Sequence, residues 1–206
     1  MSTISTVFWD VGGVLLTNGW DHAGRKNVLD YFGMDVEEFE RRHPDPCDAW
    51  EKDLIDVEEY LAETVFYEAR GFTPANFFNQ MKAQSVELPD GALRILERMA
   101  TSSHLELAIL NNESRELNDY RLNEFDLTAL FDCFFSSCYL GLRKPDEKIY
   151  ARALDIVQRL PEEVAFIDDR PENVAAAAAL GINGIRFQNP AQLMAELDAL
   201  GIAIAV

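Results

Sequence analysis

The chain has 206 residues, and 48% of them are hydrophobic, which is enough to bury a core and argues against global disorder. Its formal net charge of −18, from 18 basic and 36 acidic residues, would repel a phosphate backbone, so we expect no nucleic-acid partner. It has no apolar run of the roughly 18 residues that a membrane-spanning helix needs, and its first residues lack the pattern of a secretory signal, so we expect a cytoplasmic protein with no membrane partner.

The first predicted element is a buried strand in the apolar run from Thr6 to Leu15, and this strand ends at Asp10. From about residue 18 to residue 85 the pattern predicts helices only. The aromatic residues of this stretch indicate a small core of its own. Its predicted helix starts carry typical capping residues: Asp21, Asp35, Asp56 and Thr73.

The remainder of the chain alternates apolar runs with helical patterns. The runs predict strands at residues 107–110, 133–135, 164–167 and 184–187. Helices are predicted at residues 90–101, from Pro145 with Ile149, Ala153 and Ile156 at helical spacing, and from Pro171 to Gly181. Because strand and helix alternate, we expect an α/β fold with a parallel sheet and right-handed crossovers.

These elements predict two domains. We expect a Rossmannoid parallel-sheet core formed by residues 1–17 and 86–206, with a helical cap at residues 18–85 inserted after the first strand. An insertion at this point would stand over the C-terminal end of that strand, where Asp10 lies, and such a position suggests a lid.

Three carboxylates mark the ends of two predicted strands. Asp10 ends the first strand, and Asp168 and Asp169 follow the strand at residues 164–167. Carboxylates gathered in this way are costly unless a cation binds them. The C-terminal edge of a parallel sheet is also where ligands usually bind, so we expect a functional site at this edge.

Four segments, in this order along the chain, resemble the motifs of the haloacid dehalogenase-like (HAD) hydrolase superfamily. They are residues 8–15 around Asp10, residues 109–112, residues 141–146 with Lys144 and the following Ile149-Tyr150, and residues 166–173 with the Asp168-Asp169 pair. The third and fourth segments are most similar to bacterial α-D-glucose-1-phosphate phosphatases and to the phosphatase domain of soluble epoxide hydrolases. The resemblance covers nearly the whole chain and implies a hydrolase of phosphoric monoesters.

The resemblance also implies the central residues of the site. Asp10 is the expected nucleophile, because a carboxylate can attack phosphorus and form an aspartyl-phosphate. Mg²⁺ is the expected cofactor, bound by the carboxylates of Asp10 and Asp169 and by the backbone carbonyl of Gly12. Asp168 and Asn173 are expected to contribute to the metal site through water or by orienting its ligands.

The remaining candidates surround the expected phosphoryl group. Lys144 is implied as the second catalytic residue, the positive charge beside the nucleophile and the phosphoryl oxygens. Asn111 and Asn112 match positions that donate hydrogen bonds to the phosphoryl group or to the substrate in relatives. Asn18 and Trp20, at the entrance to the predicted cap, are candidates for contact with the ligand. The alternative for these two residues is a hinge turn with a buried tryptophan.

The sequence departs from the family pattern at two positions. Gly12 stands where most phosphatases of the superfamily have an aspartate that transfers protons, and Asn111 replaces a serine or threonine. The loss of acid–base help typically costs about 10²–10⁴-fold in rate. Water, the leaving group itself, Glu113 or Asp21 are the alternative proton carriers. The histidines have no metal-site or triad spacing and are expected to be structural or exposed: His22, His43 and His104.

The favoured prediction is a Mg²⁺-dependent phosphatase that acts on a small phosphorylated metabolite, such as a sugar phosphate, as a monomer or homodimer. Two alternatives stay open: carbon–halogen hydrolysis, and a catalytically weak phosphate-binding or regulatory protein, which Gly12 and Asn111 suggest. Dehalogenases of the superfamily run without Mg²⁺, so the acidic pair at 168–169 favours metal and phosphate. The substrate depends on cap side chains whose orientation the sequence does not determine.

Overall fold

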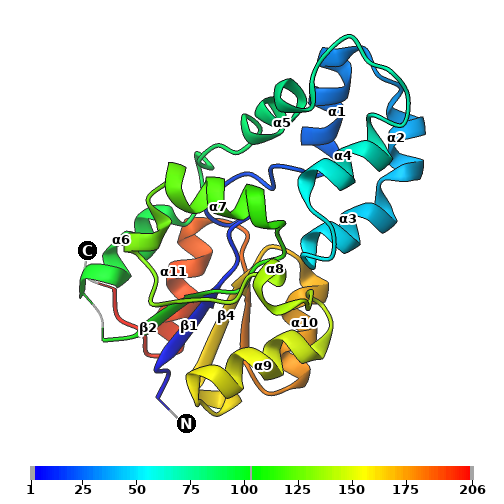
Figure 1. The fold of residues 1–206 in the computed structure, drawn as a ribbon. Helices are drawn as coiled ribbons and strands as arrows, with labels where there is room; N and C mark the ends of the chain where they lie inside the picture. Colours follow the sequence, from blue (N-terminus) through cyan, green and yellow to red (C-terminus); the bar gives the residue numbers. More distant parts are fainter. Residues whose placement is uncertain (1–2, 103, 205–206) are drawn as a thin grey trace.

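A single parallel sheet forms the centre of the molecule, in a computed structural model that describes residues 3–102 and 104–204. Its strands follow the order β3-β2-β1-β4-β5 (Figure 1). Their bounds are β1 (Thr6–Trp9), β2 (Glu106–Ile109), β3 (Cys133–Phe134), β4 (Val164–Asp168) and β5 (Asn183–Arg186). The predicted α/β fold with a parallel sheet is confirmed.

The register of the central strand decides where the acidic residues meet. Trp9 of β1 is the partner of Ile109 in β2 and of Ile167 in β4. The next residues, Asp10 and Asp168, therefore reach the same edge of the sheet, because parallel strands in register end together. All four residues of β1 are buried, as expected for a strand that is covered on both faces.

Helices cover both faces of the sheet, and successive residues of β1 face opposite layers. Trp9 belongs to a cluster with side chains of α6 (Leu93–Ser102), α7 (Arg115–Glu124) and α11 (Pro190–Ala199). Phe8 belongs to a second cluster, on the face covered by α9 (Glu147–Val157) and α10 (Pro171–Ala179). Shorter helices connect these layers: η1 (Leu127–Ala129), α8 (Ser137–Leu140) and η2 (Pro161–Glu163).

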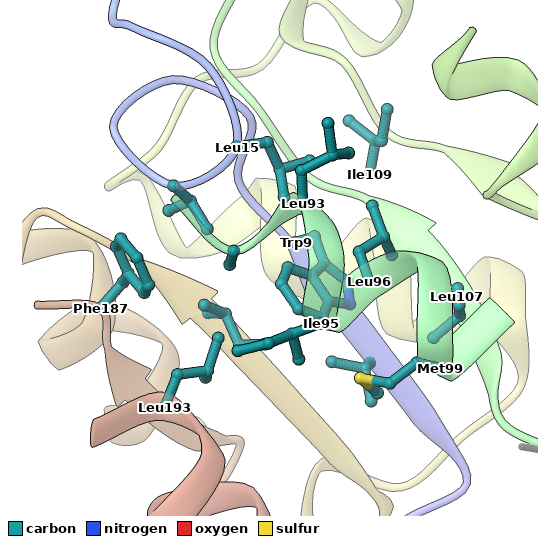
Figure 2. Close-up of a cluster of buried hydrophobic side chains, with 14 of the residues drawn as sticks. Trp9, Leu15, Leu93, Ile95, Leu96, Met99, Leu107, Ile109, Phe187 and Leu193 are labelled. Carbon is teal, nitrogen blue, oxygen red and sulfur yellow. The ribbon is translucent and has the colours of Figure 1, made fainter. Parts of the chain in front are cut away.

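Figure 2 shows the first of these clusters, in which the indole of Trp9 lies among aliphatic side chains of α6 and β2. Trp9 is fully buried, as are Leu96 and Met99. The burial of such large side chains on a central strand favours one position of β1 in the sheet, and hence one position of Asp10.

Five helices lie between β1 and α6 and gather at one end of the molecule (Figure 1). They are α1 (His22–Phe32), α2 (Val36–Arg42), α3 (Pro44–Glu51), α4 (Val57–Thr64) and α5 (Pro74–Lys82). We call residues 18–85 the helical insertion. Trp50, Tyr60 and Phe77 are among the residues of its own hydrophobic cluster. No helix in the described part of the chain is both long enough and apolar enough to cross a membrane.

The predicted caps of these helices are confirmed. The side chain of Asp21 accepts a hydrogen bond from the backbone of Gly24, and α1 ends at Gly33 with a positive φ of 65°. Asp56 and Glu59 form a reciprocal capping box at the start of α4. Asp35 caps α2 by accepting from the backbone N–H of Glu38, and Thr73 forms a reciprocal capping box with Asn76 at the start of α5.

In two of the predicted elements, some apolar residues are not fully buried. Ile156 of α9 is 51% exposed, because the buried face of this helix is centred on Ala153 and Val157 and Ile156 lies beyond its margin. The strand predicted at residues 133–135 is short, and both residues of β3 are only partly buried. The cause is its position at the edge of the sheet, where one side has no neighbouring strand.

Candidate active site

Three carboxylates converge at the C-terminal edge of the sheet. One oxygen from each of Asp10, Asp168 and Asp169 lies within 4.8 Å of the others. The backbone N–H of Asp10 donates to the carbonyl of Ile167 at 2.9 Å, which extends the pairing of β1 and β4 to the site. The parallel register thus brings together the acids that the sequence placed at two strand ends.

Lys144 lies between two of these carboxylates. Its Nζ is 3.0 Å from Oδ1 of Asp10 and 2.6 Å from Oδ2 of Asp168, and the side chain is 1% exposed. Asn112 holds the backbone of Lys144 by two hydrogen bonds of 2.8 Å. Its side-chain amide donates to the carbonyl of Lys144 and accepts from the N–H of Lys144. Burial opposes the charge on Lys144, but the two carboxylates outweigh it and raise the pKa of the ammonium group.

The three acids differ in the hydrogen bonds that they accept. Both oxygens of Asp168 are engaged, by Lys144, by the amide of Asn173 and by the backbone N–H of Arg170. By contrast, Oδ1 of Asp169 is buried and has no hydrogen-bond partner among the described residues. Asp168 is therefore placed to orient Lys144, whereas Asp169 keeps an oxygen available to a ligand.

Asp10 has one oxygen engaged as well. Its Oδ1 accepts from the backbone N–H of Val11 at 2.8 Å and contacts Lys144. Burial, together with the charges of Asp168 and Asp169, raises the pKa of Asp10 to about 7, against the opposing effect of Lys144. A divalent cation between these acids would favour their ionised forms, because it would offset both the burial and the mutual repulsion.

The surroundings of Asp169 fit a small hard cation. A Cβ atom at Gly13, which has a φ of 73°, would lie 2.3 Å from Oδ2 of Asp169, so only glycine leaves room for this carboxylate. The side chain of Asn18 lowers the pKa of Asp169, against the larger effect of burial, which raises it. Carboxylate oxygens, such as those of Asp10 and Asp169, are the ligand type that Mg²⁺ prefers. The expected contribution of the Gly12 carbonyl stays a prediction.

A cavity of about 480 Å³ opens onto this edge of the sheet and is lined on its other side by the helical insertion. Asp10, Gly12, Asn112 and Lys144 line it from the sheet side. The predicted candidates Asn18 and Trp20 also line it, and the indole of Trp20 donates to the hydroxyl of Tyr60 at 2.7 Å.

Asn111 is placed differently from its neighbour. It is 2% exposed, it is absent from the cavity lining among the described residues, and its amide donates to Oδ1 of Asn118 at 3.1 Å. Asn118 therefore competes for the amide that was predicted to bind phosphate. The phosphate-binding role of Asn111 stays a prediction.

Arg121 of α7 is a cavity residue that no sequence pattern indicated, since it lies in a polar helix without a motif. It is 3% exposed and donates to Oε2 of Glu113 at 2.8 Å and to the backbone carbonyl of Thr17. Glu113 also lines the cavity, and burial raises its pKa to about 7 although Arg121 lowers it. Of the two side chains considered as proton carriers, Glu113 is therefore ion-paired, whereas Asp21 caps α1.

The insertion contributes side chains to the cavity that the sequence analysis did not assign to the site. Arg25 and His43 line the cavity from the insertion, and Arg143, which precedes the catalytic candidate Lys144, lines it from the sheet side. Arg143 contacts Asp48 at 2.8 Å and Glu51 at 2.6 Å, so it links the sheet edge to α3. These arginines pair with acids that lie far from them in the chain, and the local spacing of residues does not reveal such pairs.

Comparisons with known proteins agree with this fold. The family model of haloacid dehalogenase-like hydrolases matches residues 4–181. The chain is 32% identical over 182 residues to the chloroplastic flavin mononucleotide hydrolase 1 of Arabidopsis thaliana, and the match covers 88% of this chain and 73% of that protein. Over 99 residues it is 31% identical to (S)-2-haloacid dehalogenase 4A of Burkholderia cepacia, covering 48% of this chain and 42% of the relative.

A solved structure shares the fold. The HAD family enzyme bt-2542 of Bacteroides thetaiotaomicron, in complex with magnesium and inorganic phosphate, superimposes with a TM-score of 0.77 at 19% identity, over 90% of this chain and 95% of that one. The name of the Arabidopsis relative places that protein in the chloroplast, so the cytoplasmic location expected here stays a prediction. The family match over most of the chain, together with the plant relative, shows that this protein belongs to the haloacid dehalogenase-like hydrolases.

Proposed function

We propose that this protein is a Mg²⁺-dependent phosphatase of small phosphorylated metabolites, in the class of sugar phosphates, and that residues 18–85 act as its cap. The observation that carries the proposal is the arrangement of Asp10, Asp168 and Asp169 around Lys144. Three buried or half-buried carboxylates with one lysine leave an excess of negative charge, which a bound metal ion would offset. The metal ion and Lys144 would then hold the negative phosphoryl group.

The residues support a two-step displacement at phosphorus. Asp10 attacks, a bond forms between its carboxylate oxygen and phosphorus, and the bond from phosphorus to the leaving oxygen breaks. That oxygen takes up a proton and departs as an alcohol. Water then attacks the aspartyl-phosphate, so the bond from phosphorus to Asp10 breaks and inorganic phosphate is released with a free carboxylate.

Each neighbouring residue has a distinct part in these steps. Lys144, contacting Asp10 at 3.0 Å, would hold the negative charge of the phosphoryl oxygens close to the nucleophile. Asp168 and Asn112 keep the lysine in place. Mg²⁺, held by Asp10, Asp169 and the carbonyl of Gly12, would neutralise charge that develops on the phosphoryl oxygens.

The relatives support the phosphatase without deciding the substrate. The Arabidopsis relative is named as a hydrolase of flavin mononucleotide, a phosphoric monoester, and the Bacteroides structure holds magnesium and phosphate. The dehalogenase relative keeps carbon–halogen hydrolysis as the rival. The oxygen Oδ1 of Asp169, buried and without a hydrogen-bond partner among the described residues, favours the phosphatase, because a metal ion would engage it.

The cavity favours a polar leaving group. Apart from Trp20, Cys47 and Gly12, every lining residue in the described part of the chain carries a charged or polar side chain. Trp20 offers little surface for stacking, because it is 8% exposed and packs edge-on against Phe39 and Phe77. A flat aromatic ring system would find few partners here, whereas a polyhydroxylated group would find many.

Replacement of the nucleophile tests this proposal. Asp10→Asn keeps the shape of the side chain and removes the attacking oxyanion, so turnover of α-D-glucose 1-phosphate and of p-nitrophenyl phosphate should fall at least about 10³-fold. Asp155→Asn, the same change at an exposed position of α9, is the matched control and should keep the wild-type rate.

Two further measurements separate the alternatives. A chelator should abolish the wild-type activity, and added Mg²⁺ should restore it. Phosphatase activity that survives both the chelator and Asp10→Asn would refute the proposal. Release of halide from 2-chloropropionate without metal, in the absence of phosphatase activity, would establish the rival instead.

A further inference from the structure

A chain of hydrogen bonds inside the helical insertion ends at a histidine on the cavity wall. The indole Nε1 of Trp20 donates to the hydroxyl oxygen of Tyr60 at 2.7 Å. The same hydroxyl lies 2.8 Å from Nδ1 of His43. All three side chains are buried, with Tyr60 fully so, and both Trp20 and His43 line the cavity.

The donors and acceptors in this chain favour one position for a proton. An indole N–H can only donate, so the oxygen of Tyr60 accepts from Trp20. The phenolic hydrogen of Tyr60 then pairs both groups if it is donated to the lone pair of Nδ1 of His43. A neutral imidazole carries one proton, and with Nδ1 as the acceptor that proton resides on Nε2.

His43 is held in its neutral form by its surroundings. Burial lowers the pKa of His43 to about 4, and the nearby cations Arg25 and Arg143 act in the same direction, against a smaller effect of Glu40. Its ring stacks on Phe39 with centroids 5.5 Å apart, which limits its rotation. The Nε2 atom has no hydrogen-bond partner in the described part of the chain.

His43 is the single residue between α2 and α3, and its backbone has helical angles. Its side chain makes no capping bond with the start of α3. The hydroxyl of Tyr60, and not a helix end, is therefore the hydrogen-bond partner of the imidazole. The reactive edge with Asp10 and Lys144 lies on the sheet side of the same cavity.

We propose that His43 recognises the leaving group of the substrate by donating a hydrogen bond from Nε2 to one of its hydroxyl or ether oxygens. Tyr60 and Trp20 act as positioning residues that keep the proton on Nε2. The proposal rests on the phosphatase function above and names the residue of the insertion that selects an oxygen-rich leaving group. A neutral donor of this kind suits an uncharged oxygen, while Lys144 serves the phosphoryl group.

Side-chain replacements can separate this role from a structural one. Glutamine places an amide N–H close to the position of the histidine Nε2, whereas asparagine is too short and imitates Nδ1. The kcat/KM for α-D-glucose 1-phosphate should therefore fall about tenfold in His43→Asn and His43→Phe, mainly through KM, and recover in part in His43→Gln. Acetyl phosphate, whose small leaving group does not reach the insertion, should be hydrolysed within twofold of the wild-type rate by all three.

The positioning residues have their own test. Tyr60→Phe removes the hydroxyl that orients His43, so it should lower kcat/KM for α-D-glucose 1-phosphate by a smaller factor. It should have no further effect in the His43→Phe background, since the pair acts as a unit. Tyr67→Phe is the matched control, because the ring of Tyr67 contacts Arg42 and Arg70 and it does not line the cavity in the described structure.

Nitrogen-15 NMR of the imidazole adds a readout that does not depend on activity. The wild type should show the Nε2–H tautomer of His43 from pH 6 to pH 8, and Tyr60→Phe should shift the population toward Nδ1–H. An Nδ1–H tautomer in the wild type, equal losses on both substrates, or unchanged selectivity in His43→Asn would each overturn the proposal while the phosphatase function stands. If the wild-type protein hydrolyses neither α-D-glucose 1-phosphate nor acetyl phosphate, the proposed function is refuted. The role of His43 is then refuted too, whichever tautomer its imidazole adopts.

Discussion

At the scale of single residues, three aspartates at one edge of the sheet have different surroundings and therefore different capacities. Asp168 has both oxygens engaged by Lys144, Asn173 and a backbone N–H, so it cannot accept a further strong ligand without losing one of them. Asp169 retains a buried oxygen without a partner among the described residues, and Asp10 faces the cavity beside Lys144. All three residues are aspartates, so only their hydrogen-bond partners distinguish Asp168, which orients Lys144, from Asp10 and Asp169, which are the proposed metal ligands.

The difference can be measured with Asp169→Asn. The substitution removes a carboxylate whose pKa is raised by burial and by Asp168, so it relieves repulsion and should leave Tm unchanged or higher. It should weaken Mg²⁺ binding by at least about tenfold in isothermal titration calorimetry, because a charged ligand becomes a neutral one. Asp155→Asn serves again as the control, and an unchanged Mg²⁺ affinity in Asp169→Asn would contradict the metal assignment.

Gly12 permits a second test at this scale, since its φ lies outside the left-handed region. A Cβ at this position would lie 2.8 Å from Oδ1 of Asn18, the end of a flexible side chain, so Asn18 must move or be shortened. Gly12→Asp combined with Asn18→Ala should raise the turnover of alkyl phosphates, whose poor leaving groups need a proton, more than that of aryl phosphates. A carboxylate beside Asp10 would supply this proton.

The neighbouring glycine is the matched control for that variant. Gly13→Asp would bring a Cβ within 2.3 Å of Asp169 at a φ of 73°, so it should disrupt the site and lower all activities. If the Gly12→Asp, Asn18→Ala protein loses activity on every phosphate while Mg²⁺ still binds, another residue already transfers the proton. Glu113, with a pKa raised to about 7, would then be the next candidate.

At the scale of elements, the first turn of α7 connects the sheet domain to the helical insertion. The carboxylate of Glu116 accepts from the indole of Trp50 at 2.8 Å and from the backbone N–H of Val57, at the start of α4, at 2.9 Å. Beside it, Arg115 forms two hydrogen bonds to Asp53, at 2.8 and 2.6 Å. One helix end therefore holds the loop between α3 and α4 over the site.

Removal of the Glu116 carboxylate should loosen this contact. In Glu116→Ala two N–H groups of the insertion lose their partner, so the free energy of unfolding should fall by about 1–3 kcal/mol. Amide hydrogen exchange at residues 50–57 should become faster, while exchange in β1 and β4 should change less. Glu124→Ala, at the exposed last turn of the same helix, should leave exchange at residues 50–57 unaltered. Equal exchange in the two variants would show that Glu116 does not hold the insertion.

At the scale of the whole molecule, the cavity between sheet and insertion limits what can reach Asp10. Two connections join the insertion to the sheet domain, and they pair with each other where the N–H of Thr17 donates to the carbonyl of Val86 at 2.8 Å. Paired connections of this kind permit the insertion to move as a unit around them. The cavity of about 480 Å³ suits a metabolite and is too small for a folded protein domain.

The size limit yields a prediction about substrates. α-D-Glucose 1-phosphate should be hydrolysed at least about 10²-fold faster, in kcat/KM, than a phosphoserine in a folded protein, because the closed insertion excludes the larger substrate. The rate of phosphate release from both substrates at equal concentration measures this ratio. Similar rates would show that the insertion does not close over the site.

Much of the fold was predictable because it depends on local pattern. The strands that carry Asp10 and Asp168, the capping residues Asp21 and Asp56, and the position of the insertion all follow from periodicity and helix-end chemistry over a few residues. The exposed Ile156 shows the limit of this reasoning, because only the packing of α9 on its neighbours decides which edge of its apolar face is covered.

The sequence by itself determined the HAD-like α/β fold and the position of three carboxylates at the ends of its strands. Both follow from motifs and apolar runs that lie within short segments of the chain. Only the tertiary structure decided which of these acids binds Lys144, that Arg121 contacts the entrance of the insertion at Thr17, and that Tyr60 orients His43. These contacts join segments far apart in the chain. Their formation depends on the register of the sheet and on how the insertion packs, and no local spacing of residues encodes either one.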